Sequence, residues 1–130
     1  MEAKGPFQVD LKPLDSYASG VEGTNLGRMS IDKTFTGDLD AVSQGAMLSA
    51  MTSVKGSAGY VAIEQVQGTL AGKKGTFVLQ HFATMAGGEQ RQIIEVVPDS
   101  GTGELVGLSG EMEIIIEEGG HFYAFNYTLD

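Results

Sequence analysis

The chain of 130 residues has the length of one domain and is long enough to bury a core without disulfide or metal support. Its formal net charge of −9, with only eight scattered lysines and arginines, excludes nucleic acid as the expected partner, because binding to a phosphate backbone needs clustered basic residues. The absence of cysteine excludes disulfides, a thiolate nucleophile and every cysteine-ligated metal site.

Short segments rich in Val, Ile, Thr, Phe and Tyr follow one another along the chain, separated by turns that contain glycine. No window shows the apolar period of an amphipathic helix, so the pattern predicts an all-β meander. Residues 1–130 are expected to form a single domain. The predicted strands cover residues 3–11, 26–36, 42–54, 57–71, 75–86, 89–97, 110–117 and 121–129.

The turns test whether these strands share one apolar face, because a tight hairpin fixes which residues lie opposite each other. A turn at 73–74 would place Val66 opposite His81. The next turn, at 87–88, would place His81 opposite Ile94. Both hairpins therefore predict the same inner face.

Two other hairpins agree with this face. A turn at 55–56 would place Met47 opposite Glu64. The last hairpin turns within 117–120, and its inner face contains Met112, Ile114, Ile116, His121, Tyr123, Phe125 and Tyr127.

The turn at Gly37 and Asp38 is the exception. A two-residue loop there would point Phe35 away from the shared face, so we predict a three-residue loop or a bulge. The register of strand 26–36 is left open by this turn.

One consistent face favours a single sheet closed into an eight-stranded antiparallel β-barrel, since closure removes the exposed edges that promote aggregation. At this strand number, the interior is either filled by side chains or wide enough for one small ligand. The sequence leaves these two alternatives open.

Glu64 and His81 are the candidate catalytic residues, because both are expected to face the apolar interior. The register places them diagonally, roughly 7 to 8 Å apart at the backbone and within side-chain reach. A carboxylate in such a place must pair, accept hydrogen bonds or take up a proton. The pair could therefore act as general acid and base, or it could be a buried polar clamp.

Other inward-facing residues are candidates for ligand binding. They combine apolar side chains with hydroxyl and amide groups, although tyrosine and methionine also serve as core packing. The predicted ligand-binding residues are Met47, Ser49, Met51, Tyr60, Leu79, Gln92, Ile94, Ile114, Tyr123, Phe125 and Tyr127.

No cofactor or metal site is expected. Segment 99–107, DSGTGELVG, lacks the alternating carboxylates of a calcium loop, and no helix follows it to hold a dinucleotide. It is predicted to be a turn. The two histidines, His81 and His121, have no metal-ligand spacing, and His121 is expected at one barrel mouth.

No membrane insertion is expected. The N-terminal MEAKGPFQVD lacks the apolar run of a signal peptide, and no stretch of about eighteen apolar residues occurs. We therefore expect a soluble, acidic, cytoplasmic protein.

The ordered segments KTFTGDL (33–39), GTFVLQH (75–81), VVPDSGTGELVGLSGE (96–111) and GHFYAFNYTL (120–129) resemble a bacterial family of unknown function. Its members look like small barrels of the allene oxide cyclase type. The resemblance implies the barrel architecture and a cavity. It implies no activity, because fold alone does not define function.

Three functions are compatible with these features. The first is a barrel that binds a small apolar or amphiphilic molecule. The second is an isomerase or cyclase in which Glu64 and His81 transfer protons. The third is a structural homo-oligomer whose outer face, including Val61, Ile63 and Phe82, contacts another copy.

Overall fold

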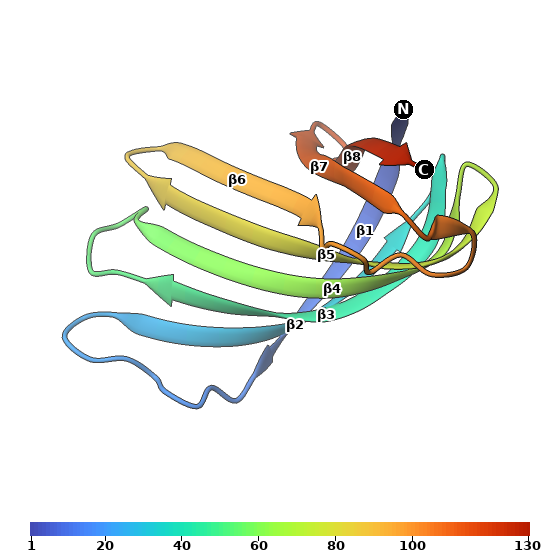
Figure 1. Ribbon diagram of the computed structural model, residues 1–130. Coiled ribbons are helices and arrows are strands. Elements are labelled where there is room, and N and C mark those ends of the chain that lie inside the picture. Colours follow the sequence, from blue (N-terminus) through green and yellow to red (C-terminus); the bar gives the residue numbers. More distant parts are fainter.

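The computed structural model describes residues 1–130, and it confirms the all-β prediction. Eight antiparallel strands, each paired with its neighbours in sequence, form a closed barrel in which β8 returns to β1 (Figure 1). A single 3-10 turn, η1, precedes the last hairpin. The elements are β1 (Glu2–Leu14), β2 (Asn25–Phe35), β3 (Leu39–Met51), β4 (Ala58–Leu70), β5 (Lys73–Ala86), β6 (Glu89–Val96), η1 (Gly103–Leu105), β7 (Leu108–Glu117) and β8 (Gly120–Leu129).

The hairpin between β4 and β5 turns two residues earlier than predicted. Its loop is Ala71–Gly72, and Leu70 pairs with Lys73. Both loop residues have positive φ, 49° and 83°, which is the backbone of the two-residue turn that matches strand twist. His81 therefore pairs with Ala62 and not with Val66. The error spans an even number of residues, so every side chain keeps its predicted face.

The loop between β3 and β4 also differs from the prediction. It spans residues 52–57, so Met47 pairs with Ala62 instead of Glu64. The shift is again even and leaves the faces unchanged. A six-residue loop was missed because Lys55 and Gly56 suggested a tight turn.

Three predicted turns are confirmed. Residues 36–38 lie between β2 and β3, and Phe35 pairs with Ala41, so an odd number of residues separates the two partners and Phe35 faces inward as predicted. The β5–β6 hairpin turns at 87–88, with His81 opposite Ile94 as expected. The last hairpin pairs Glu117 with Gly120.

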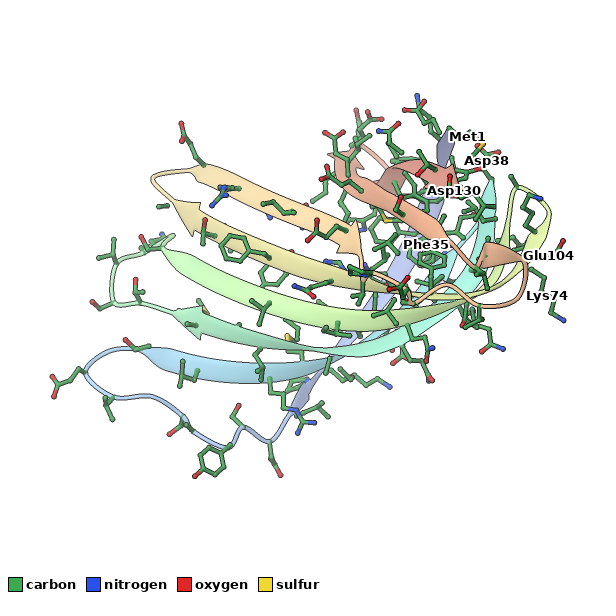
Figure 2. All side chains as sticks on the ribbon, viewed as in Figure 1. Met1, Phe35, Asp38, Lys74, Glu104 and Asp130 are labelled. Atoms are coloured by element: carbon green, nitrogen blue, oxygen red, sulfur yellow. The ribbon has the colours of Figure 1, made fainter.

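One half of the barrel interior is filled by side chains. This half lies at the end with the 36–38 loop, η1 and both chain termini, where Figure 2 labels Phe35. Ring contacts join Phe77 to Phe125 at 5.8 Å and Phe125 to Tyr127 at 5.3 Å. Leu105 of η1 is buried against the same core. The fold is therefore anchored at this end.

The barrel wall is weakest between β6 and β7. Only one residue pair, Glu95 with Glu111, joins these two strands, whereas β7 and β8 pair along their whole length. Figure 1 shows β6 diverging from β7. The structure contains no helix with the length and apolar composition of a membrane-spanning segment.

Candidate functional site

A buried carboxylate with three polar partners lies between the filled and the open half of the barrel. Glu64 is 0% exposed. Its Oε2 accepts hydrogen bonds from Lys33 Nζ at 2.8 Å and contacts His81 Nε2 at 2.5 Å. Its Oε1 accepts a hydrogen bond from Ser43 Oγ at 2.6 Å. Every oxygen of the carboxylate is thus satisfied, as burial of a charge requires.

The strand register brings these four side chains together. Lys33 on β2 pairs with Ser43 on β3. Glu64 on the next strand, β4, is diagonal to Ser43. On the other side of β4, His81 of β5 is also diagonal to Glu64. Four neighbouring strands each contribute one inward polar side chain at the same level of the barrel.

The cluster favours the charged form of the carboxylate. Desolvation by burial acts to raise the pKa of Glu64, but the hydrogen bond from His81 and the charge of Lys33 outweigh it and hold the pKa at about 2. Lys33 is 7% exposed, and its Nζ also lies 5.3 Å from the ring centre of Phe7 and 5.8 Å from that of Phe35. Aromatic faces and a carboxylate thus compensate the buried ammonium.

The open half of the barrel contains a pocket of about 340 Å³ next to this cluster. Nine of its fourteen lining residues are apolar, and none is acidic. The lining residues are Phe7, Val9, Leu11, Ile31, Lys33, Met47, Tyr60, Ala62, His81, Gln90, Gln92, Ile114, Ile116 and His121. An apolar wall with a few convergent polar groups is typical of small-molecule sites.

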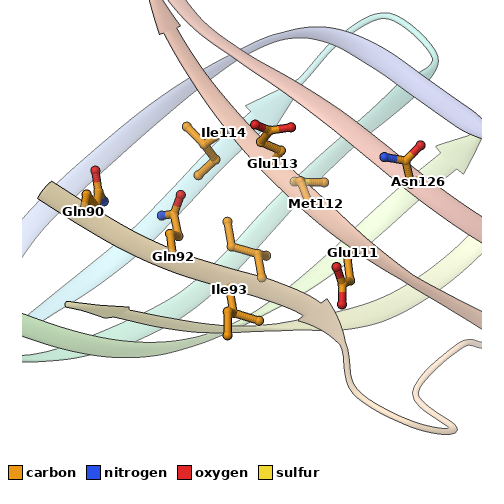
Figure 3. Close-up of a pocket in the computed structure, with 9 residues that line it drawn as sticks. Gln90, Gln92, Ile93, Glu111, Met112, Glu113, Ile114 and Asn126 are labelled. Carbon is orange, nitrogen blue, oxygen red and sulfur yellow. The ribbon is translucent and has the colours of Figure 1, made fainter. Parts of the chain in front are cut away.

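The pocket continues into the gap between β6 and β7. Figure 3 shows this gap, a hollow of about 640 Å³. Gln90, Gln92 and Ile114 line both the hollow and the inner pocket. The side hollow therefore borders the inner pocket, whose lining also includes exposed His121.

The structure divides the predicted site residues among several places. His81 lines the pocket, and Glu64 lies behind it, within hydrogen-bond distance. Met51 is 59% exposed at the end of β3, and Ser49 is half-buried opposite Tyr60. Four predicted ligand residues line the pocket: Met47, Tyr60, Gln92 and Ile114. Five lie in the filled core: Leu79, Ile94, Tyr123, Phe125 and Tyr127.

Lys33 and Ser43 were missed by the sequence reasoning. The signal was present at the 36–38 loop, because a three-residue loop points Phe35 inward and Lys33, two residues earlier, to the same face. Ser43 likewise lies two residues after Ala41 on β3 and therefore shares its inward face. No group of three or more His, Cys, Asp or Glu side chains is arranged to hold a metal ion.

Comparison with known proteins confirms the family resemblance. Residues 3–127 match the family model described as "Protein of unknown function (DUF3224)". The crystal structure of a protein with unknown function from the DUF3224 family of Shewanella oneidensis MR-1 is 60% identical, with a TM-score of 0.97 over 100% of this chain and 97% of that chain. No curated protein matches the chain.

Proposed function

We propose that this chain, which belongs to the DUF3224 family of proteins of unknown function, binds one small amphiphilic molecule in its inner pocket. The observation that carries the proposal is the pairing of an apolar pocket of about 340 Å³ with one polar end formed by Lys33 and His81. The volume falls within the range of small-molecule sites, roughly 300 to 1,000 Å³.

The polar groups of the pocket select the head group of the ligand. Lys33 donates, and Tyr60 has a hydroxyl proton available because its oxygen accepts from Gln92 Nε2 at 2.7 Å. None of the pocket's lining residues is acidic, and Glu64 behind them is covered by its partners. A ligand with a carbonyl or carboxylate head therefore fits, whereas a cationic head would meet a buried ammonium.

Binding of decanoate, compared with decylammonium, tests this proposal. Isothermal titration at pH 7 is expected to show one decanoate site and at least tenfold weaker binding of decylammonium. Equal affinities for both would contradict the role of Lys33 at the polar end. Binding of neither probe would contradict the proposal of a ligand-binding barrel.

Replacing Met47 by tryptophan should block the pocket. Met47 faces the pocket, and the larger indole would occupy the space of the ligand, so decanoate affinity is expected to fall at least tenfold. Leu48→Trp is the matched control, because Leu48 is the next residue on β3 and is 57% exposed on the outer face. If Met47→Trp folds and binds as tightly as the control, the ligand lies elsewhere.

The homo-oligomer remains a second proposal, supported by an apolar row on the outer face. Leu48, Val61, Phe82 and Ile93 lie directly opposite one another across β3 to β6, and Ile63 lies beside Val61. All five are at least 37% exposed. A straight row of this kind can pack against the same row of a second copy, as in a two-fold dimer.

Sedimentation of wild type and of Phe82→Glu tests the homo-oligomer. We expect a dimer that the new charge converts to a monomer, with Gln8→Glu, exposed on the outer face of β1 and away from this row, as the control that stays dimeric. A monomeric wild type at high concentration would contradict it. The cytoplasmic location stays a prediction.

A further inference from the structure

One nitrogen of the His81 ring is open to the pocket. Nε2 contacts Glu64 Oε2 at 2.5 Å, whereas Nδ1 takes part in no hydrogen bond. Every fully buried nitrogen or oxygen atom of a side chain in the structure has a hydrogen-bond partner. Since Nδ1 has none and His81 lines the pocket, Nδ1 lies at the pocket surface.

Glu64 determines which nitrogen carries the proton. Its carboxylate is ionised and can only accept, so Nε2 of His81 must donate to it. In the neutral ring, this leaves the lone pair on Nδ1, directed to where a ligand would lie. A carboxylate that holds one imidazole nitrogen and frees the other is the arrangement of a general base with its orienting group.

Lys33 supplies a positive charge at the same place. Its Nζ and the Nε2 of His81 bond to the same oxygen of Glu64, so the two groups are immediate neighbours. Lys33 uses one of its three N–H donors on Glu64, and its side chain is part of the pocket lining. An oxyanion that forms beside His81 would therefore be next to a fixed cation in a largely apolar cavity.

From this arrangement we propose that the pocket catalyses proton transfer at a carbon next to a carbonyl group, with His81 as the base and Lys33 as the oxyanion donor. The inference rests on the proposed binding function and names its substrate class: an amphiphile with a ketone or aldehyde head.

The reaction needs no co-reactant. His81 Nδ1 takes the proton from the α-carbon, and the C–H electron pair forms the C=C bond of an enolate while the carbonyl π electrons move to oxygen. Lys33 donates a hydrogen bond to this oxygen. The imidazolium then returns the proton to the same carbon or to a conjugated one, which exchanges or isomerises the substrate. Glu64 is a positioning residue, because it touches only protein groups.

An imine between Lys33 and the carbonyl is the competing chemistry. Imine formation needs the free electron pair of the Lys33 amine at a carbonyl carbon, but Nζ is held 2.8 Å from the Glu64 carboxylate by a hydrogen bond. Lys33 is therefore better placed to stabilise an oxyanion than to attack a carbon atom.

Hydrogen exchange of 2-tetralone in D2O tests the reaction. This compact ketone has an apolar body, and proton NMR follows the loss of its two C1 protons. With wild type, we expect exchange about 10²-fold faster than with free imidazole at the same concentration. His81→Gln should bind the ketone but lose the acceleration. Gln80→Ala, altered on the outer face of the same strand, should keep it.

Nitrogen-15 NMR of His81 provides a readout that needs no turnover. The neutral ring is expected to carry its proton on Nε2, and Glu64→Gln should weaken this preference. A proton on Nδ1 in wild type would overturn the assignment of the base.

The outcomes separate the two proposals. If 2-tetralone binds without faster exchange, the reaction is overturned and the binding function stands. If it does not bind although decanoate does, the carbonyl substrate class is wrong. If cyanoborohydride traps the ketone on Lys33, the chemistry is imine formation and the oxyanion role is wrong.

Discussion

Glu64→Gln is expected to lower the free energy of unfolding by about 3 to 5 kcal/mol at pH 7, the cost of removing one partner from a buried ion pair. The glutamine side chain has nearly the same shape but no charge. Lys33, 7% exposed, would keep its ammonium group in the barrel without a counter-charge. Urea denaturation followed by circular dichroism measures the loss.

The double variant Lys33→Met/Glu64→Gln separates charge from packing. Methionine fills much of the volume of lysine and removes the buried cation, so most of the lost stability is expected to return. If the double variant is as unstable as Glu64→Gln, the loss arises from the Ser43 and His81 hydrogen bonds and not from the unpaired charge.

The effect of Glu64 is also expected to depend on pH. The folded-state pKa of Glu64 is about 2, below the ordinary value of 4.5, so its ionisation stabilises the fold above pH 4.5. This contribution, about 3 kcal/mol from the pKa difference, is lost as pH falls from 4.5 toward 2. The stability difference between wild type and Glu64→Gln should shrink over that window. A difference that stays constant with pH would contradict the low pKa.

The inner face of the barrel was predictable because strand alternation tolerates even errors of register. Two hairpins were predicted with the wrong cross-strand partners, displaced by two residues between β3 and β4 and by four between β4 and β5. Every residue nevertheless kept its predicted face. Glu64 lies two residues from both Val66, the predicted partner of His81, and Ala62, the observed one. The pair is therefore diagonal in either register, and its proximity did not depend on the exact turn.

The cationic half of the cluster was not predicted, since a charged residue is normally assigned to the outer face. Lys33 faces inward because the 36–38 loop adds a third residue and reverses the parity of β2 relative to a two-residue turn. The sequence showed that this turn was unusual. It did not show that a lysine would be buried as a result, because that depends on a carboxylate two strands away.

The division of the interior into a filled and an open half could not be predicted either. Alternation assigns a side chain to the inside but says nothing of how far along the barrel axis it packs. Aromatic residues gather at the end closed by η1, whereas Ala62 and Met47 leave space at the other. Side-chain volumes at matching levels of all eight strands determine this division, and the turns indicate only some of the registers.

The polar cluster lies between these two halves. Burying its charged groups costs desolvation free energy, and a contribution to stability does not explain why they are there. A core of apolar residues at the same level would fold at least as well, because desolvating ions offsets most of their attraction. Departures from local folding rules gather at functional sites. The buried Lys33, Glu64 and His81, next to a pocket, follow this pattern and support the proposed proton-transfer role.

Phe125→Ala should destabilise the protein by about 3 to 5 kcal/mol, because Phe125 is 0% exposed and the filled half cannot collapse around the missing ring. The rings of Phe77 and Tyr127 both stack with it, at 5.8 Å and 5.3 Å between ring centres. Denaturant titration compares this variant with Glu113→Ala, which lies on the exposed outer face of β7 and is expected to change stability by no more than about 0.5 kcal/mol.

The same pair of variants tests whether anchoring and binding reside in different halves of the barrel. Phe125 belongs to the filled core and does not line the inner pocket, so folded Phe125→Ala should bind decanoate with nearly wild-type affinity despite its lower stability. Met47→Trp should show the opposite behaviour, weak binding with a smaller loss of stability. A large loss of affinity in Phe125→Ala would mean that the core supports the pocket directly. A larger loss of stability in Glu113→Ala than in Phe125→Ala would mean that the faces of β7 and β8 are inverted.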